Sequence, residues 1–348
     1  MAEAADTTGA QPLDDDPAAR VLVAGASGFA GALAAQLVWR HPRLELVQVT
    51  SRSDVGTRLD RLYPRYRVPL ELTELDVDGI EECDAAIVAY PHGAAAPAVA
   101  ALRGLGLQVV DLSADFRLND PETYREWYGE LGEPTLLPEA VYGLPELYRE
   151  RIAESSLVAN PGCYPTATIL ALAPLAAEGL IADVVVDAKS GVSGAGRGGG
   201  DRNHFVTLDE NASPYGVAGH RHQPEIAQEL DALAGGGPTP LTFVPHLLPL
   251  DQGELVSCYV RPARNLSAED LAALYADRYS DERFVELVDG PPGVRDVRDT
   301  NICRIHVTVN GGRVLAFAAI DNLWKGAASQ AVQNLNLMLG LPEGEGIA

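Results

Sequence analysis

The sequence predicts an α/β protein with a parallel-sheet domain early in the chain and an α+β domain with a largely antiparallel sheet after it. A buried-strand run, a glycine turn and a helical pattern follow one another over residues 19–42, as at the start of a parallel sheet. Later apolar strand-like runs include a clear hairpin turn through Asn310, Gly311 and Gly312. A length of 348 residues accommodates two domains of ordinary size.

The composition excludes several classes of protein. The chain has 47% hydrophobic residues, yet no apolar run approaches the roughly 20 residues that a membrane span needs. Its net charge of −23 argues against nucleic acid or an anionic membrane as a partner. The four cysteines have no paired spacing and indicate neither a disulfide framework nor a zinc site, so we expect a reducing cytoplasm. Residues 1–19 lack the basic start and apolar core of a secretory signal and are expected to form a disordered acidic tail.

The first strand is followed by glycines at every third position, Gly25, Gly28 and Gly31. This pattern is related to the dinucleotide turn, in which glycine lets the backbone approach a pyrophosphate at the start of a helix. We therefore predict a Rossmann-type domain whose cofactor contacts include these glycines, Ser27 and Phe29. The alternative is a tight turn with a purely structural role.

The end of the next strand indicates which dinucleotide binds. NAD sites usually place an acidic residue there to hold the ribose 2′-hydroxyl. This chain has Ser51, Arg52 and Ser53 instead, and a cation flanked by hydroxyls suits a 2′-phosphate. The sequence therefore predicts NADP, unless Arg52 is only a solvated loop residue.

Cys163 stands apart from the other three cysteines, which lie in apolar strand-like runs. Pro161 and Gly162 break the chain just before it, and a helical apolar run follows up to Gly179. A thiol at a helix N-terminus lies near the positive end of the helix dipole, which favours the thiolate. Cys163 is therefore a candidate nucleophile, the alternative being a buried cysteine on a helix cap.

A Ser/Gly-rich loop, "KSGVSGAGRGGG", begins directly at the end of a β-branched strand. Glycine backbone, hydroxyl groups and a guanidinium are the usual parts of an oxyanion or phosphate site. We expect Ser193 and Gly194 to contact the cofactor, and Ser190 and Arg197 to contact a substrate phosphate. Arg117, at the end of another predicted strand, is a further phosphate candidate, and the alternative for the loop is a flexible linker.

His220 and His222 lie two residues apart just before a helix that Pro224 starts. On an extended segment such a pair would face the same side. No third ligand shares the segment, so acid/base work is favoured over a metal site, and a structural role is the remaining alternative. We expect His222 to be the acid/base and His220 to contact the substrate.

The chain ends in an amphipathic helix predicted over residues 324–340, which packing alone would also explain. We expect this helix to complete a nucleotide domain at 20–160, with Asn322 at the cofactor. Residues 161–323 would then form the catalytic and dimerisation domain.

Taken together, these features resemble the N-acetyl-γ-glutamyl-phosphate reductases of arginine biosynthesis, a family in the aspartate-semialdehyde dehydrogenase-like group. The resemblance runs from residue 21 to about 340, and its most specific segment is the Pro-Gly-Cys-Tyr-Pro-Thr run. The matching segments are "GASGFAG", "TSRSDVG", "DLSADFRL", "VYGLPEL", "ANPGCYPTATILALAPL", "KSGVSGAGR", "GHRHQPEI" and "DNLWKGAA".

The resemblance implies NADPH-dependent reduction of N-acetyl-glutamyl 5-phosphate to the 5-semialdehyde and phosphate, through a thioester on Cys163. It also implies a homodimer or homotetramer without a metal, and adds Asn160 to the substrate contacts. Rival hypotheses are a reductase of a carrier-linked aminoadipyl or glutamyl phosphate, aspartate-semialdehyde dehydrogenase itself, and a non-catalytic NADP-binding redox sensor. An acidic chain would repel an acidic carrier protein electrostatically, which argues against the carrier-linked substrate. A redox sensor would not need both the cysteine and the histidine pair.

Overall fold

A computed structural model describes residues 17–80, 82–198 and 200–347 of the chain. The acidic tail expected at residues 1–19 lies outside the described residues except for its last three. The chain divides into two compact units, Met1–Pro161 with Ala327–Ala348, and Gly162–Gly326. Each unit has a sheet of its own.

The first unit is built on a seven-stranded sheet in the order β3-β2-β1-β4-β5-β7-β6. Every pairing in it is parallel, which confirms the predicted Rossmann-type sheet. The strands are β1 Ala19–Ala24, β2 Leu44–Thr50, β3 Leu72–Thr73, β4 Ala85–Val88, β5 Gln108–Asp111, β6 Ala140–Tyr142 and β7 Leu157–Ala159. The order reverses beside β1, and ligands of open α/β sheets bind at such a switch point.

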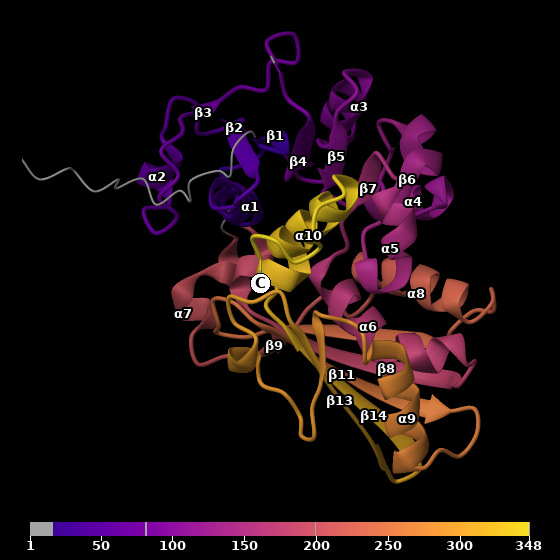
Figure 1. Ribbon diagram of the computed structural model, residues 1–348. Helices are drawn as coiled ribbons and strands as arrows, with labels where there is room; N and C mark the ends of the chain where they lie inside the picture. Colours follow the sequence, from indigo (N-terminus) through magenta and orange to yellow (C-terminus); the bar gives the residue numbers. More distant parts are fainter. Residues whose placement is uncertain (1–16, 81, 199, 348) are drawn as a thin grey trace, which may run out of the picture. The chain divides into compact units, whose positions relative to one another are not determined.

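Helices cover both faces of this sheet. Val99 and Leu102 of α3 pack against Leu22 of β1, so alternate residues such as Val21 face the other side, where α1 and α10 lie next to each other (Figure 1). Most residues of both helices are buried. The helices are α1 Phe29–Trp39, α2 Leu59–Leu62, α3 Ala96–Gly104, α4 Pro121–Tyr128, the 3₁₀ turn Pro134–Glu139, α5 Pro145–Ala153 and α10 Ser329–Met338.

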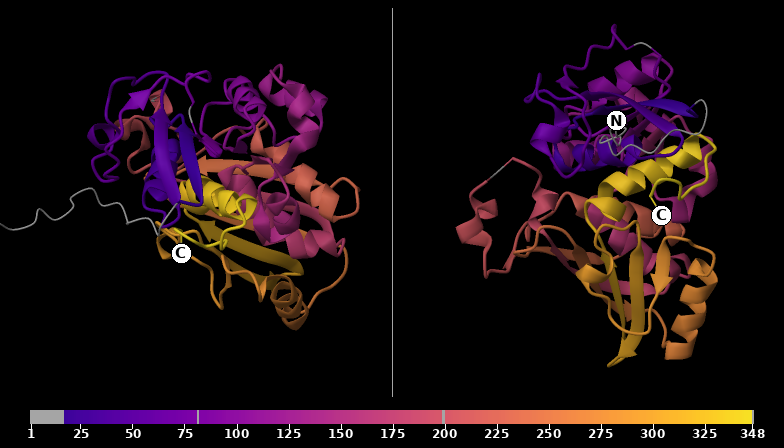
Figure 2. Two further views of the ribbon diagram at one scale, coloured as in Figure 1. Left: turned by 45° about the horizontal axis from the view of Figure 1, so that its top comes forward. Right: turned by 60° about the vertical axis from the view of Figure 1, so that its left-hand side comes forward.

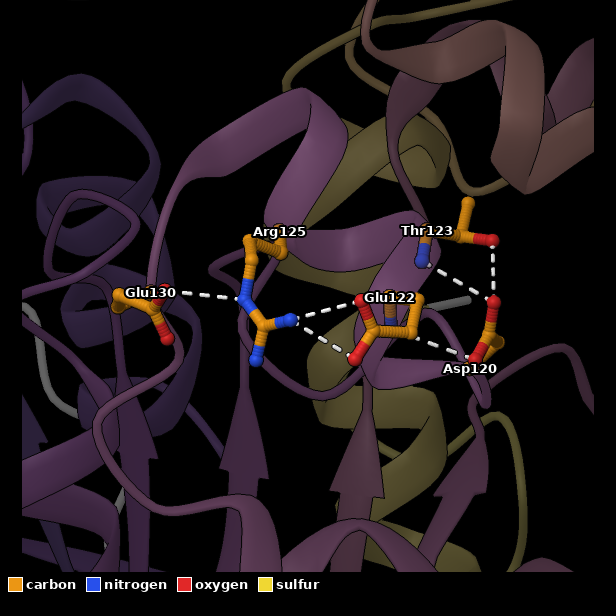
Figure 3. Close-up of polar contacts among 5 residues, drawn as sticks. All are labelled: Asp120, Glu122, Thr123, Arg125 and Glu130. Atoms are coloured by element: carbon orange, nitrogen blue, oxygen red, sulfur yellow. Dashed lines mark hydrogen bonds and ion pairs between the residues drawn. The ribbon is translucent and has the colours of Figure 1, made fainter.

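Helix α4 buries Tyr124, whose hydroxyl donates to Asp115 at 2.7 Å, and has local interactions on its surface (Figure 3). The Asp120 carboxylate caps it by accepting from the backbone N–H groups of Glu122 and Thr123, at 3.3 and 3.0 Å. Arg125 donates to the Glu122 carboxylate and pairs with Glu130 at 2.9 Å. Because these ion pairs are exposed, each stabilises the helix by only about 0.5 kcal/mol, and the Asp120 cap stabilises it more, by about 1 kcal/mol.

The second unit is built on a seven-stranded sheet in the order β12-β13-β14-β11-β8-β10-β9. The pairs β8–β10 and β12–β13 are parallel and the others antiparallel, as predicted for this domain. The predicted hairpin turn joins β13 to β14, and Gly311 and Gly312 adopt the positive φ angles, +58° and +75°, that a two-residue turn of this kind requires. The strands are β8 Ile181–Ser190, β9 Ser213–Pro214, β10 Leu241–Leu247, β11 Glu254–Pro262, β12 Val285–Leu287, β13 Cys303–Asn310 and β14 Arg313–Ile320.

Helix α6, Cys163–Ala177, is the central helix of the second unit and is buried almost all round. Pro174 lies inside it and has no N–H to donate to the Leu170 carbonyl. The Tyr279 hydroxyl of α9 donates to that carbonyl at 2.6 Å, so the lost helical bond is replaced. The other helices of this unit are α7 Phe205–Leu208, α8 His222–Leu233 and α9 Ala268–Tyr279.

A short arm that contains α7 projects from the sheet of the second unit (Figure 2). Phe205 and Val206 on it are 74% and 86% exposed, whereas β8, the strand before the arm, has only buried and half-buried residues. The arm follows the Ser/Gly-rich loop, so this loop leads from a rigid strand into an exposed segment.

Candidate active site

Cys163 is the first residue of α6, directly after Gly162, whose extended backbone (φ −68°, ψ 156°) makes it the N-cap. The thiol is half-buried, while Cys258 and Cys303 are buried. A Cβ added to Gly326 would come within 2.8 Å of the Cys163 Cβ, so a glycine is required beside it. The predicted placement of a thiol at the start of a helix is thus what the structure has.

The amide at this helix start is held by a carboxylate. Gly162 donates its N–H to Glu225 Oε1 at 2.9 Å, and the Glu225 side chain is buried. This amide is therefore occupied, and a substrate oxyanion would need the next ones, at Cys163 and Tyr164, since Pro165 has none. Glu225 fixes the geometry of the residue just before the thiol.

The two histidines lie together against Tyr164, the residue after Cys163. The ring centroids of His220 and His222 are 4.9 Å apart, and each is within 6 Å of the Tyr164 ring, at 5.9 and 5.8 Å. The reason given from the sequence was wrong, because the segment is not extended. Arg221 has a helical backbone (φ −58°, ψ −19°) and His222 is already the first residue of α8. A turn into a helix, rather than a strand, brings the rings together.

The two rings have different surroundings. His220 Nδ1 accepts the backbone N–H of His222 at 3.1 Å, which fixes the ring and assigns this nitrogen as an acceptor. Burial, and secondarily the Arg221 charge, lower the pKa of His220 to about 4. His220 is therefore neutral at pH 7, which makes it a poor proton donor in that range.

Two tyrosine hydroxyl groups lie beside the histidine pair. The Tyr215 hydroxyl donates to the Tyr164 hydroxyl at 3.2 Å, and the latter donates to the His246 carbonyl at 3.4 Å. Burial raises the pKa of both tyrosines well above the ordinary range, so both remain neutral hydrogen-bonding groups.

Glu254 is a second carboxyl group near the thiol. It is the first residue of β11 and is fully buried. Burial raises the pKa of Glu254 to about 8, while the nearby Cys163 thiol and Ser190 hydroxyl oppose this shift. These contacts are loose, because neither carboxylate oxygen has a partner at strict hydrogen-bond geometry among the described residues.

The Ser/Gly-rich loop brings four predicted residues together. Asn322 Nδ2 donates to Ser193 Oγ at 3.0 Å, and a Cβ on Gly194 would lie 3.5 Å from Ser190 Oγ and 3.6 Å from Asn322 Nδ2. Arg197 lies farther along the loop, in its exposed part. Ser190, Ser193, Gly194 and Asn322 thus lie close together, and Arg197 lies apart from them on the loop.

Lys189 points away from this cluster, since neighbouring residues of a strand face opposite sides. It pairs with Asp187 at 2.7 Å and donates to Ser257 at 3.2 Å. Lys325, in the segment after Asn322, is buried with its Nζ 5.5 Å from the centre of the Phe284 ring.

In the first unit, the glycine turn is sterically required. Gly25 has φ +85°, and a Cβ there would come within 2.7 Å of the Ala89 carbonyl oxygen. A Cβ on Gly31 would collide with the Gly25 carbonyl, and Gly28 is the extended N-cap of α1. Phe29 is the first residue of that helix. These glycines thus let the backbone form a tight cradle at a helix N-terminus.

The predicted 2′-phosphate loop borders a cavity of about 610 Å³ in the same unit. Ser51 Oγ donates to Ser27 Oγ at 2.8 Å and accepts the N–H groups of Ser53 and Asp54, so it ties this loop to the glycine turn. Arg52 is exposed and lines the cavity. The lining residues are Ser51, Arg52, Glu74, Leu75, Tyr90, Gly93, Ala94, Pro97 and Ala98.

Arg117 and Asn160, predicted to bind substrate, contact each other in the first unit. Arg117 Nε donates to the Asn160 carbonyl at 2.8 Å and Nη2 to the Leu112 carbonyl at 2.7 Å. Asn160 is fully buried, and its side chain donates to the Ala327 carbonyl and accepts from Asn334. These contacts hold the chain two residues before Gly162 in sequence.

Comparison with known proteins agrees with this layout. Residues 20–155 match the family description "Semialdehyde dehydrogenase, NAD binding domain", and residues 163–322 match "Semialdehyde dehydrogenase, dimerisation domain". The chain is 47% identical over 339 residues to the N-acetyl-gamma-glutamyl-phosphate reductase of Citrifermentans bemidjiense, covering 94% of this chain and 97% of the relative. This chain belongs to the N-acetyl-gamma-glutamyl-phosphate reductase family.

Solved structures with the same fold have much lower sequence identity to this chain. Aspartate semialdehyde dehydrogenase II of Vibrio cholerae, solved as a complex with ASA, matches with a TM-score of 0.70 at 18% identity, covering 92% of this chain and 98% of that one. The enzyme of Candida albicans, solved with NADP, matches with a TM-score of 0.69 at 16% identity, covering 92% and 98%. At these identities the likeness concerns the fold.

Reasoning from the sequence missed Glu225 and Glu254 in this family member. Glu225 lies in the "GHRHQPEI" segment, where the histidines drew attention instead. Glu254 opens an apolar strand, and an acidic residue at such a position was the available signal. Within residues 17–80, 82–198 and 200–347 there is no group of three metal-ligating side chains, and no helix there has the length and apolar character of a membrane span.

Proposed function

We propose that this protein is an NADP-dependent N-acetyl-gamma-glutamyl-phosphate reductase that forms a thioester on Cys163. The carrying observation is Cys163 at the N-terminus of α6, in one unit with the histidine pair, in a chain 47% identical to a reductase of that name. A thiol at a helix N-terminus is activated as a nucleophile, and an acyl phosphate provides the leaving group that such a nucleophile needs.

The first unit has the chemistry to hold the cofactor. The tight turn that Gly25 and Gly31 allow at the N-terminus of α1 suits a pyrophosphate, and Arg52 at the cavity rim suits a 2′-phosphate. Ser27, Gly28, Phe29, Ser51 and Ser53 belong to the same two loops, and we retain them as cofactor contacts. Ser193, Gly194 and Asn322 of the second unit are likewise proposed contacts. When bound, NADPH supplies the hydride that reduces the thioester to the aldehyde.

The protein's own residues carry the remaining steps. The Cys163 thiolate attacks the acyl carbon, the bond to the phosphate oxygen breaks, and phosphate leaves with the electron pair. The amides of the first turn of α6 stabilise the oxyanion, a contribution of about 3 kcal/mol per donor in comparable sites. After reduction the carbon–sulfur bond breaks, the aldehyde leaves and Cys163 is regenerated.

We assign the proton transfers to His222. The acceptor role of His220 Nδ1 and a pKa near 4 leave that ring neutral with its proton on Nε2, so it is suited to orient a substrate group by donating a hydrogen bond. His222 lies beside it at the start of α8, with its ring centroid 5.8 Å from that of Tyr164, the residue after Cys163. It is the better candidate to take the thiol proton and to protonate the departing phosphate.

Four residues remain proposed ligands of the substrate's anionic groups. Ser190, buried at the end of β8, and Arg197, on the exposed loop after it, are candidates in the second unit. Arg117 and Asn160 are candidates in the first unit, where polar groups of both side chains already bind other parts of the chain. In an acidic protein, the positive charges of Arg117 and Arg197 would also concentrate an anionic substrate.

We further propose a homodimer or homotetramer in the cytoplasm. The second unit matches a dimerisation domain, and its sheet presents half-buried apolar side chains, Leu255, Tyr259, Leu315 and Phe317, on neighbouring strands. All four cysteines are free, which suits a reducing compartment. Light scattering after gel filtration measures the oligomeric state, and a monomer at micromolar concentration would contradict the proposal.

The function is tested by running the reaction backwards. Purified protein is assayed with NADP, phosphate and a panel of semialdehydes: N-acetylglutamate 5-semialdehyde, aspartate semialdehyde and a carrier-linked semialdehyde. We expect phosphate-dependent NADPH formation with the first, at a kcat/KM well above the others. A preference for the carrier-linked substrate, or NADPH formation independent of phosphate, would contradict the proposal.

A further inference from the structure

Glu254 occupies a position where a carboxyl group is costly. In the antiparallel pairings of β11 it lies opposite Ser190, the last residue of β8, and opposite Ile320, the last residue of β14. It is 0% exposed, and an apolar side chain would fill such a site at a lower cost. Strands β11 and β14 pack against α6, and a Cβ on Gly326 would contact both Cys163 and Ile320, so this strand end lies near the nucleophile. A carboxyl group at this position therefore needs an explanation.

The surroundings of Glu254 favour its neutral form. No ion pair joins it to a Lys, Arg or His among residues 17–80, 82–198 and 200–347. The titratable groups that face it are all acids: Cys163 and Tyr164 from α6, Tyr215 after β9, and Asp321 after β14. Burial and the Asp321 charge raise the pKa of Glu254 to about 8, so at pH 7 the carboxyl group carries its proton.

A neutral carboxyl group is a hydrogen-bond donor. The neutral Glu254 carboxyl group has one O–H to donate, and Ser190 and Cys163 are the two neighbours that could accept it. The Ser190 hydroxyl already donates its own proton to the Gly191 carbonyl at 3.2 Å, which leaves only its lone pairs to accept a hydrogen bond. The Cys163 sulfur gains most from a donor, because it becomes an anion before it attacks. A buried carboxylic acid held neutral so that it can donate is a known device for stabilising an anion in an active site.

We propose that Glu254, as a buried neutral acid, donates a hydrogen bond to the Cys163 thiolate and so sets the reactivity of the nucleophile. This role rests on the proposed function for its importance in turnover, but the contact itself is a property of the protein without substrate. It adds a second control on the thiol, separate from the histidine pair. Ionisation of Glu254 removes the donor and places a negative charge beside the sulfur, which disfavours the thiolate.

The test is the rate of alkylation of Cys163 by iodoacetamide as a function of pH, without substrate or cofactor. Because the two groups titrate as a coupled pair, the wild type should show two steps, one of them near pH 8. Glu254→Gln keeps a donor but cannot ionise, and should show a single step. Glu254→Leu removes the donor and should react about tenfold more slowly at pH 7. Cys163→Ser gives the background rate.

Two results would overturn the proposal: a Glu254→Leu profile that superimposes on the wild type, or two steps that persist in Glu254→Gln. Folding is checked by thiol counting, because Cys258 and Cys303 are buried and react only if a variant unfolds. If both variants unfold, infrared spectra of the wild type decide. A protonated-carboxyl band that disappears near pH 8 and shifts in Cys163→Ser supports the contact, and an insensitive band contradicts it. Failure of the reverse assay with normal alkylation would refute the proposed function and leave this contact standing.

Discussion

The two sites of this protein are built from different chemical groups. In the first unit, the cradle consists of a tight backbone turn that Gly25 and Gly31 allow, and of hydroxyl groups that bind one another, with Arg52 at the rim of the neighbouring cavity. In the second unit, the site consists of half-buried or buried ionisable groups, with Cys163, Glu225 and Glu254 close to one helix start.

This difference decides what a mutation changes. A site of amides and hydroxyls has few protons to lose near neutral pH, so its substitutions should alter cofactor affinity or folding. A site of buried ionisable groups depends on their protonation states, so its substitutions should alter rate and pH dependence. The predictions below test this division, in order of decreasing effect.

The largest effect is expected for Cys163→Ser. A hydroxyl at this position is far less nucleophilic than a thiolate, so kcat should fall by at least about a thousandfold. NADPH binding, measured by fluorescence titration, should stay within a few-fold of the wild type, because the cradle lies in the other unit. Cys83→Ser is the matched control and should keep full activity. Substantial activity in Cys163→Ser would contradict the thioester route.

The histidines should separate in the pH profile. His222→Asn should flatten one limb of the plot of kcat/KM against pH and lower its maximum by about a hundredfold, since it removes the acid/base. His220→Asn should mainly raise the KM for the acyl phosphate, because a ring with a pKa near 4 does not titrate in the working range. The reverse pattern would exchange the two roles, and no effect from either variant would make the pair structural.

In the first unit, Arg52→Ala should raise the KM for NADPH by about ten- to a hundredfold and leave that for NADH unchanged, because only NADPH carries the 2′-phosphate. Arg58→Ala is the matched control: Arg58 is exposed, pairs with Asp60 and does not line the cavity. Steady-state kinetics with both cofactors measure the effect. An equal loss with NADH would contradict the 2′-phosphate assignment.

The glycines of the turn should differ in stability. Gly31→Ala places a Cβ against the Gly25 carbonyl and should lower the free energy of unfolding by about 1–3 kcal/mol. Gly28→Ala is the matched control, since its nearest neighbour would be 3.6 Å away and its φ of −79° suits any residue. Urea denaturation measures both, and equal stabilities would show that the turn relaxes to accept the methyl group.

The features read from the sequence were those that a short segment determines. The glycine turn, the Ser51–Ser53 loop and the Cys163 helix start each depend on neighbours within a few residues, so their patterns were sufficient. The proximity of the histidine rings was expected for a wrong reason, since backbone conformation at Arg221 is not visible in the pattern. Lys189 stands at the start of the Ser/Gly-rich loop but pairs with Asp187, because strand alternation, rather than sequence proximity, decides where a side chain points.

Glu254 could not have been placed in the site from sequence reasoning alone. It is 91 positions from Cys163 in the sequence, and it reaches the thiol only through the register of β11 against β8 and β14. Glu225 is similar, since its contact with Gly162 depends on the packing of α8 beside α6. Sites made by sheet register require the fold before they can be recognised.

The most direct test of the thioester route is to follow the reaction in the absence of NADPH. Wild-type protein is mixed with N-acetyl-glutamyl 5-phosphate, and released phosphate and intact protein mass are measured over the first turnover. We expect a burst of about one phosphate per chain and an added acyl group that peptide mapping places on Cys163, with neither in Cys163→Ser. Phosphate release from the wild type without an acyl adduct, or an adduct that forms equally in Cys163→Ser, would contradict the assignment of Cys163 as the nucleophile.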